Sequence, residues 1–135
     1  MVLVTTPEAG ATEPSLAINT AAVLLGIGAL GGIVMALIRF KGAPRPPSTL
    51  AMIHGLLGAA GLTLLIYIWA TLGLSHLGQA GTVVLVLAAV AGMYINLRYH
   101  SQMQPLPISL VIAHAVVAVL GFGLLLGAIS RAHRL

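Results

Sequence analysis

The chain has 135 residues, of which 59% are hydrophobic and only 6% are charged. A soluble domain carries about 25% charged residues, so this chain lacks the polar groups that a water-facing surface needs. It contains no cysteine, which excludes disulfides, iron–sulfur clusters and thiolate metal sites. Its net charge of +4 does not indicate nucleic-acid binding, because the six Lys and Arg residues lie at predicted helix ends and in loops, where membrane topology explains them.

Four long apolar segments follow a polar start. Residues 1–16 contain both acidic residues, with no basic start and apolar run of the kind that marks a signal peptide, and we predict an extramembrane N-terminal tail. A helix of roughly 20 apolar residues crosses a hydrocarbon core and satisfies its own backbone hydrogen bonds there. We place the four membrane-spanning helices at Ala17–Phe40, Ser48–Leu74, Ala80–His100 and Leu106–Ser130. The predicted fold is an all-α membrane protein, a four-transmembrane-helix bundle.

The basic residues indicate an orientation. Those of the first and third loops and their flanks are Arg39, Lys41, Arg45 and Arg98. Only Arg131 and Arg134 lie on the other side, in the C-terminal tail, and the second loop has no Lys or Arg. Cytoplasmic loops carry an excess of Lys and Arg. This favours cytoplasmic first and third loops, with both termini outside, in an integral protein of a bacterial inner membrane.

The chain repeats itself at an offset of 60 residues without gaps. The less common residue types that match in this register are Gly32 and Gly92, Pro47 and Pro107, His54 and His114, and Gly61 and Gly121. A fixed period is the signature of repeated structural units. We therefore predict two tandem parallel helical hairpins, at residues 17–74 and 75–135, related by a pseudo-two-fold axis along the membrane normal.

The histidine pair of this repeat is the main functional candidate. His54 and His114 each lie about a turn and a half into the second and fourth helices, and an ionisable side chain inside a membrane span is a functional hypothesis by default. Small residues follow each histidine at i+4 and i+7, on the same helix face, and leave space for a flat cofactor or a close helix. These are Gly58 and Gly61 in the first repeat, and Ala118 and Gly121 in the second.

Geometry favours a shared metal macrocycle. In a sequential bundle the second and fourth helices are diagonal, roughly 13 Å apart, which leaves room for an iron between two inward imidazoles. Arg39 and Arg98, with the other basic residues at this end, are candidates to pair with haem propionates. The remaining histidines do not form a second facing pair, because His76 falls in the outer loop and His100 at the inner end of the third span.

This pattern resembles four-helix transmembrane b-type cytochromes, such as the cytochrome b561 group and the small anchor subunits of respiratory complexes. The resemblance rests on His54, His114 and the small residues beside them, and it covers the membrane core. It implies one haem b with His54 and His114 as axial iron ligands, and not the two haems of some members. It also implies an electron-transfer subunit, with quinone and other membrane subunits as partners.

Other interpretations remain. The histidines can instead form structural hydrogen bonds between helices, with the glycines serving close packing, in a non-catalytic accessory subunit of a respiratory or photosynthetic complex. Bacteriochlorophyll is a rival occupant, since a single histidine holds its magnesium. A transporter or a hydrolytic enzyme is poorly supported, because the spans contain no carboxylate. We expect lipid as the surrounding medium and no nucleic-acid partner.

Overall fold

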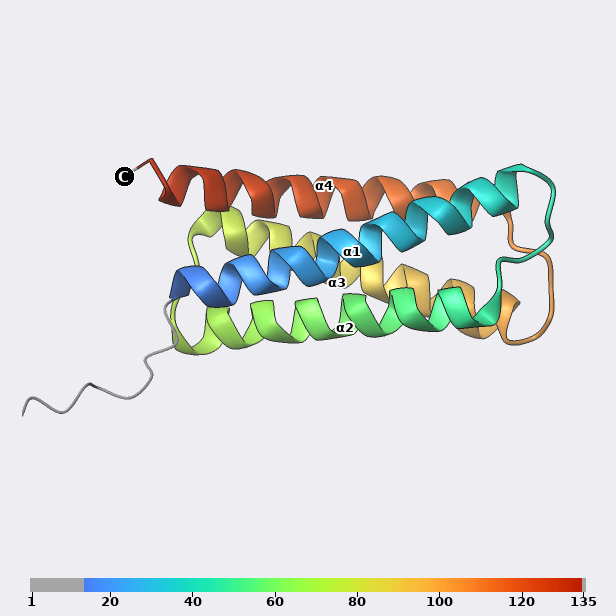
Figure 1. Cartoon of the computed structure of the whole chain (residues 1–135), viewed down its shortest axis with the longest axis horizontal. Helices are drawn as coiled ribbons and strands as arrows, with labels where there is room; N and C mark the ends of the chain where they lie inside the picture. The colour runs from blue at the N-terminus through green and yellow to red at the C-terminus, as the bar shows by residue number, and fades with distance from the viewer. Residues whose placement is uncertain (1–13, 135) are drawn as a thin grey trace, which may run out of the picture.

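The computed structural model describes residues 14–134. Four long helices account for most of them: α1 (Pro14–Phe40), α2 (Ser48–Thr71), α3 (His76–Ile95) and α4 (Ile108–Ala132), with a π-helical segment η1 (Asn96–His100) continuing α3 (Figure 1). Residues 14–40, 48–71, 76–100 and 108–132 are each long and apolar enough to cross a membrane. The protein is therefore an all-α integral membrane protein whose fold is a four-helix bundle, as predicted.

Three helix boundaries differ from the prediction for local reasons. Helix α1 starts at Pro14, so residues 14–16 of the predicted tail are helical, and proline suits a first helical turn. The rest of that tail, residues 1–13, lies outside the described residues. Helix α2 ends at Thr71, followed by Gly73 with φ +82°, a conformation that favours glycine. Helix α3 begins at His76 because the Ser75 side chain accepts a hydrogen bond from the Gly78 N–H at 3.2 Å.

The ends near the third loop also differ. The predicted third span continues to His100, but its last turn is π-helical, with the Ser101 N–H donating to the Asn96 carbonyl at 2.8 Å. Such single-turn π segments are uncommon and often occur near functional sites. Helix α4 begins at Ile108, after Pro107, and runs two residues beyond the predicted Ser130.

The helices form a ring in chain order. Each helix packs against its two chain neighbours, with α1 also beside α4, so the diagonals are α1 with α3 and α2 with α4. The contacts within the hairpins α1–α2 and α3–α4 are far more extensive than those between them. Both hairpin loops lie at one end of the bundle, and the start of α1 and the end of α4 lie at the other (Figure 1).

Burial follows the 60-residue offset of the sequence. The helical positions buried in both repeats are Ala21 and Gly81, Gly28 and Ala88, Gly61 and Gly121, Leu65 and Leu125, and Ile68 and Ala128. The two hairpins thus turn the same helix faces inward. Large apolar side chains elsewhere, such as Leu30 and Val119, are exposed on the outside of the bundle, as a lipid environment requires.

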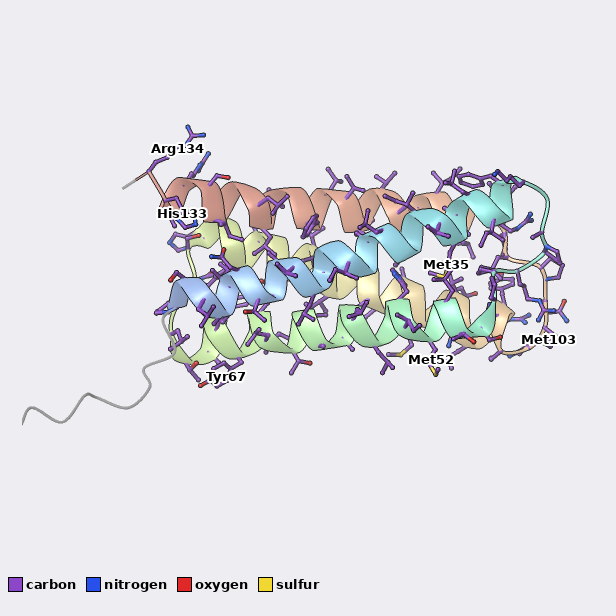
Figure 2. All side chains as sticks on the ribbon, viewed as in Figure 1. Met35, Met52, Tyr67, Met103, His133 and Arg134 are labelled. Atoms are coloured by element: carbon purple, nitrogen blue, oxygen red, sulfur yellow. The ribbon has the colours of Figure 1, made fainter. Side chains whose placement is uncertain are left out.

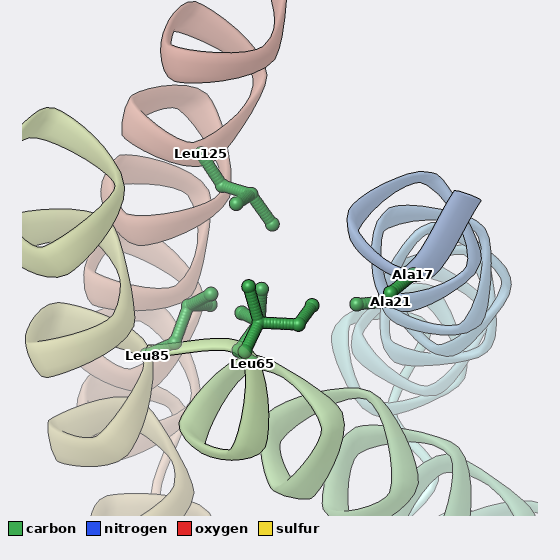
Figure 3. Packing of buried hydrophobic residues seen from close by; sticks show 6 residues of the cluster. Ala17, Ala21, Leu65, Leu85 and Leu125 are labelled. Carbon is green, nitrogen blue, oxygen red and sulfur yellow. The ribbon is translucent and has the colours of Figure 1, made fainter. Parts of the chain in front are cut away.

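The hydrophobic core lies toward the end that holds the chain termini. Leu65 and Leu125 reach the centre from the diagonal helices α2 and α4, and both are fully buried (Figure 3). Leu85 joins them from α3, and the buried members of the cluster from α1 are the small Ala17 and Ala21. In lipid there is no hydrophobic force between helices, so this close packing stabilises the bundle through van der Waals contact.

Candidate histidine site

The structure brings His54 and His114 together across the α2–α4 diagonal. Their ring centroids are 6.2 Å apart and the ring planes make an angle of 81°. The two residues come from different hairpins, and both side chains are half-buried. They lie on the loop side of the leucine core, because His54 precedes Leu65 on α2 and His114 precedes Leu125 on α4 by 11 residues each. The imidazoles are therefore near neighbours at the interface between the hairpins.

Each imidazole is oriented by a backbone carbonyl of its own hairpin. Nδ1 of His54 lies 2.8 Å from the Gly28 carbonyl oxygen on α1, and Nδ1 of His114 lies 2.9 Å from the Ala88 carbonyl oxygen on α3. A carbonyl oxygen only accepts, so Nδ1 carries the proton and donates it. In a neutral ring Nε2 is then unprotonated, with a free lone pair. Metal-ligating histidines are oriented in the same way, by a hydrogen bond from the nitrogen that does not bind the metal.

Two glycines, which the sequence reasoning did not assign to the site, lie against the rings. A Cβ atom on Gly32 would lie 3.1 Å from Cε1 of His54, and one on Gly92 would lie 2.9 Å from Cε1 of His114. Both distances are shorter than ordinary van der Waals contact. Glycine at these positions lets each imidazole approach the backbone of the neighbouring helix. The match of Gly32 with Gly92 in the repeat is the sequence signal from which these two positions could have been identified.

The small residues predicted beside the imidazoles divide into two groups. A Cβ atom on Gly61 would lie 2.7 Å from Cγ of Leu25, and one on Gly121 would lie 2.9 Å from Cγ of Leu85. These two glycines therefore provide room for a leucine of the neighbouring helix. Gly58 is different, because a Cβ atom there would meet no heavy atom within 4 Å.

Ala118 takes the position of Gly58 in the second repeat and is likewise half-buried. Its methyl group shows that the equivalent position in the first repeat has room for a small side chain. Gly58 and Ala118 are one helical turn from the histidines on the same helix face. A role of the four small residues beside a cofactor stays a prediction, and of the three glycines among them only Gly58 has open space where a Cβ atom would lie.

The two arginines predicted to pair with haem propionates have partners at the loop end. Nε of Arg39 donates to the Leu106 carbonyl oxygen at 2.7 Å, which ties the end of α1 to the loop before α4. Nη1 of Arg98 donates to Oε1 of Gln102 at 3.1 Å, and its guanidinium carbon lies 5.6 Å from the Tyr99 ring centroid. Arg98 is exposed, whereas Arg39 is half-buried.

The remaining histidines do not add to the site. His100 is buried and its Nε2 lies 3.3 Å from Oγ of Ser48, which links the end of η1 to the start of α2. His76 is exposed in the first turn of α3, at the opposite end of the bundle, and not in the loop where it was predicted. Within residues 14–134 no group of three or more His, Cys, Asp or Glu side chains could hold a metal ion.

The donor set narrows the chemistry of any metal at the pair. Two imidazoles are too few protein ligands for a tetrahedral zinc site, which takes four protein ligands, or three and a water. They are sufficient for a metal whose other ligands belong to a macrocycle, since haem iron needs only axial ligands from the protein. The donor set alone is thus compatible with the protein ligands that a haem iron takes, and equally with a pair of hydrogen-bonded structural histidines within the bundle.

Comparison with known proteins finds no matching family model, no matching curated protein and no matching solved structure.

Proposed function

We propose that the protein is a membrane electron-transfer subunit that binds one haem b between His54 and His114. The observation that carries this proposal is the pair of imidazoles, each with Nδ1 committed to a backbone carbonyl and Nε2 free. The repeat would supply a second histidine in either role, so the argument depends on the approach of the two rings to 6.2 Å across the hairpin interface. Two pre-oriented axial ligands meet the requirement of a six-coordinate haem.

The distance between the rings supports one shared metal. A metal–nitrogen bond of about 2 Å, with roughly 1 Å from a ring nitrogen to its centroid, puts two rings on one metal about 6 Å apart. The observed separation is 6.2 Å. Two bacteriochlorophylls, each with its own magnesium and macrocycle, need far more space between the histidines. The separation therefore favours a haem with both histidines over a pair of bacteriochlorophylls.

The protein residues would then set the properties of the cofactor. The carbonyl acceptors at Gly28 and Ala88 hold each imidazole in one tautomer and raise its basicity as a ligand. Gly58 and Ala118 would line the macrocycle, and Arg39 and Arg98 would lie on the side of its propionates. Haem supplies the one-electron chemistry, while the protein supplies binding, orientation and burial. Quinone and other membrane subunits are the partners that this role implies.

The test is the absorption spectrum of the purified protein with and without each histidine. The wild type should show reduced b-type bands and should not bind carbon monoxide, because both axial positions are filled. His54→Ala and His114→Ala should each lose the six-coordinate spectrum, and any haem that remains should bind carbon monoxide. His76→Ala is the matched control, because it removes an exposed histidine at the opposite end of the bundle.

Folding has to be measured beside the spectrum. Circular dichroism and size-exclusion chromatography of each variant separate the loss of a ligand from the loss of the bundle. A wild-type protein that is folded and contains no haem when expressed with an adequate haem supply would contradict the proposal.

A second candidate is a structural accessory subunit, which the same two hydrogen bonds favour. Each imidazole joins the two helices of its own hairpin, and such bonds inside membranes contribute about 0.6 kcal/mol on average. In that case the protein is colourless, and each histidine substitution lowers its stability by about that amount without any spectral change. The absorption spectrum thus separates the two functions directly.

We also propose a bacterial inner membrane location with the α1–α2 and α3–α4 loops in the cytoplasm. The excess of basic residues at the loop end supports this orientation. The absence of cysteine from the chain makes labelling straightforward, because any single introduced cysteine is the only reactive thiol. In intact cells Lys41→Cys should resist a membrane-impermeant thiol reagent, and His133→Cys should react. The reverse pattern would invert the orientation.

A further inference from the structure

The side chain of Arg45, in the loop between α1 and α2, lacks a strong hydrogen-bond acceptor. Its Nη1 donates to the sulfur of Met103 in the loop between α3 and α4, and its Nε is buried with no partner. A thioether is a weak acceptor, and an unpaired buried donor is unfavourable. Turning the guanidinium from the sulfur toward an anion would therefore cost little.

Within residues 14–134 there is no acidic side chain that could serve as its partner. The only two acidic residues, Glu8 and Glu13, precede the described residues, and the chain has no Asp or Glu after them. Lys41 and Arg98, at the same end of the bundle, are exposed and add positive charge there. The loop end is thus a cationic surface, and the described residues contain no acidic side chain that could neutralise it.

The backbone around Arg45 is held in place by contacts between the loops. The Leu106 N–H donates to the Pro44 carbonyl oxygen at 3.0 Å, and Arg39 donates to the Leu106 carbonyl oxygen from the other side. Pro46, next to Arg45, is buried. Figure 2 shows Met103 at the end of the bundle opposite His133 and Arg134, and Arg45 contacts Met103 from the other loop. This fixes where an anion would bind.

From these contacts we propose that Arg45 binds the phosphate of an anionic phospholipid at the membrane surface. The loops follow directly from the ends of membrane-spanning helices, so lipid headgroups are the anions nearest to them. A planar guanidinium can donate to two phosphate oxygens at once. The thioether of Met103 offers only one weak acceptor in their place. Lys41 and Arg98 contribute a general attraction to the anionic surface, whereas Arg45 provides the directed contact. This site does not depend on the proposed haem.

The experiment is native mass spectrometry of the full chain in detergent, titrated with phosphatidylglycerol or with zwitterionic phosphatidylcholine. We expect phosphatidylglycerol to bind in preference, and Arg45→Gln to weaken its binding about tenfold. Lys41→Gln is the matched control, since it removes the same charge from the same loop, and it should weaken binding no more than about threefold. Met103→Leu, which removes only the sulfur contact, should leave binding unchanged or tighter.

Three results would overturn the proposal. Equal losses in Arg45→Gln and Lys41→Gln would mean a general charge effect, and equal binding of the two lipids would mean no anion site. Displacement of phosphatidylglycerol by millimolar inorganic phosphate would assign the site to a soluble anion. Absorption spectra of the same samples report the haem independently, so failure of this site and failure of the proposed function are distinguishable.

Discussion

The two ends of the bundle are packed by different means. Toward the chain termini, Leu65 and Leu125 are fully buried at the centre of the bundle, within a cluster of apolar side chains (Figure 3). Toward the loops, the centre is occupied by two imidazoles that are hydrogen-bonded to backbone carbonyls. The first end is stabilised by close apolar packing, and the second holds a pair of imidazoles at the hairpin interface. The imidazole pair of the bundle centre and its leucine core are thus separated along the helix axes.

Truncation of the leucine core should have the largest effect on stability. Leu125→Ala removes a fully buried side chain and leaves a cavity, which in soluble proteins costs about 2–5 kcal/mol. In lipid the transfer contribution is missing, so we expect about 2 kcal/mol, measured by reversible unfolding in mixed detergent micelles. Leu126→Ala, at an exposed neighbouring position, is the control and should be nearly neutral. Equal losses would mean that the leucines do not form a core.

The closest helix contacts should be the next most sensitive. An alanine at position 121 would bring its Cβ to 3.0 Å from the Leu85 nitrogen and 3.2 Å from the Gly81 oxygen, both backbone atoms. At position 61 the two nearest atoms, at 2.7 and 3.0 Å, belong to the flexible Leu25 side chain, and one backbone atom, the Ala21 oxygen, lies at 3.2 Å. We expect Gly121→Ala to cost about 1–2 kcal/mol in the same unfolding measurement, and Gly61→Ala clearly less. The reverse order would mean that the second hairpin is not the more tightly packed.

Crowding the histidine end should act on the proposed site more than on the fold. Gly92→Ala places a methyl group 2.9 Å from Cε1 of His114, so the imidazole has to turn. We expect a stability loss below about 1 kcal/mol, together with reduced haem content or partial carbon monoxide binding. An unchanged spectrum and unchanged haem content would contradict a role for Gly92 in holding the ligand.

The smallest effect is expected at Gly58. An alanine there meets no heavy atom within 4 Å, and the second repeat already has Ala118 at this position. Gly58→Ala should therefore change stability by less than about 0.5 kcal/mol and leave the haem spectrum intact. Gly58→Leu is the sharper test, because it should leave the fold unaffected and reduce haem content if a macrocycle lies beside this position. Full haem content in that variant would place the macrocycle elsewhere.

Much of the fold follows from the sequence. The four spans, the ring of helices and the approach of His54 to His114 could all be predicted, since apolar length defines a span and the repeat pairs the histidines. The start of α3 was missed because Ser75 caps a helix in a stretch that reads as a tight connection. The π-helical turn at Asn96–His100 leaves no periodicity signal in five residues.

The contacts of the site depend on how far one helix slides along another. Spacing along α2 places Gly61 on the face of His54, but only the packing of α1 shows that Leu25 fills the space beside it. The hydrogen bond from His54 to the Gly28 carbonyl could not be predicted either, because every residue has a carbonyl group and the sequence does not single one out. The hydrogen bond of Arg39 to the Leu106 carbonyl likewise depends on how the two loops meet. The axial offset between two packed helices is set by tertiary packing and cannot be predicted from the residue spacing within either helix.

The repetition of the hairpin has a consequence for the proposed haem itself. Each half of the pocket offers the same groups at the same depth: a histidine, a carbonyl acceptor and a glycine against the ring. The haem b macrocycle is not symmetric, because its two vinyl groups occupy different positions. Two hairpins that present the same groups would make nearly the same contacts with either face of such a ring. The haem would therefore insert in two orientations, related by a half turn, in nearly equal amounts.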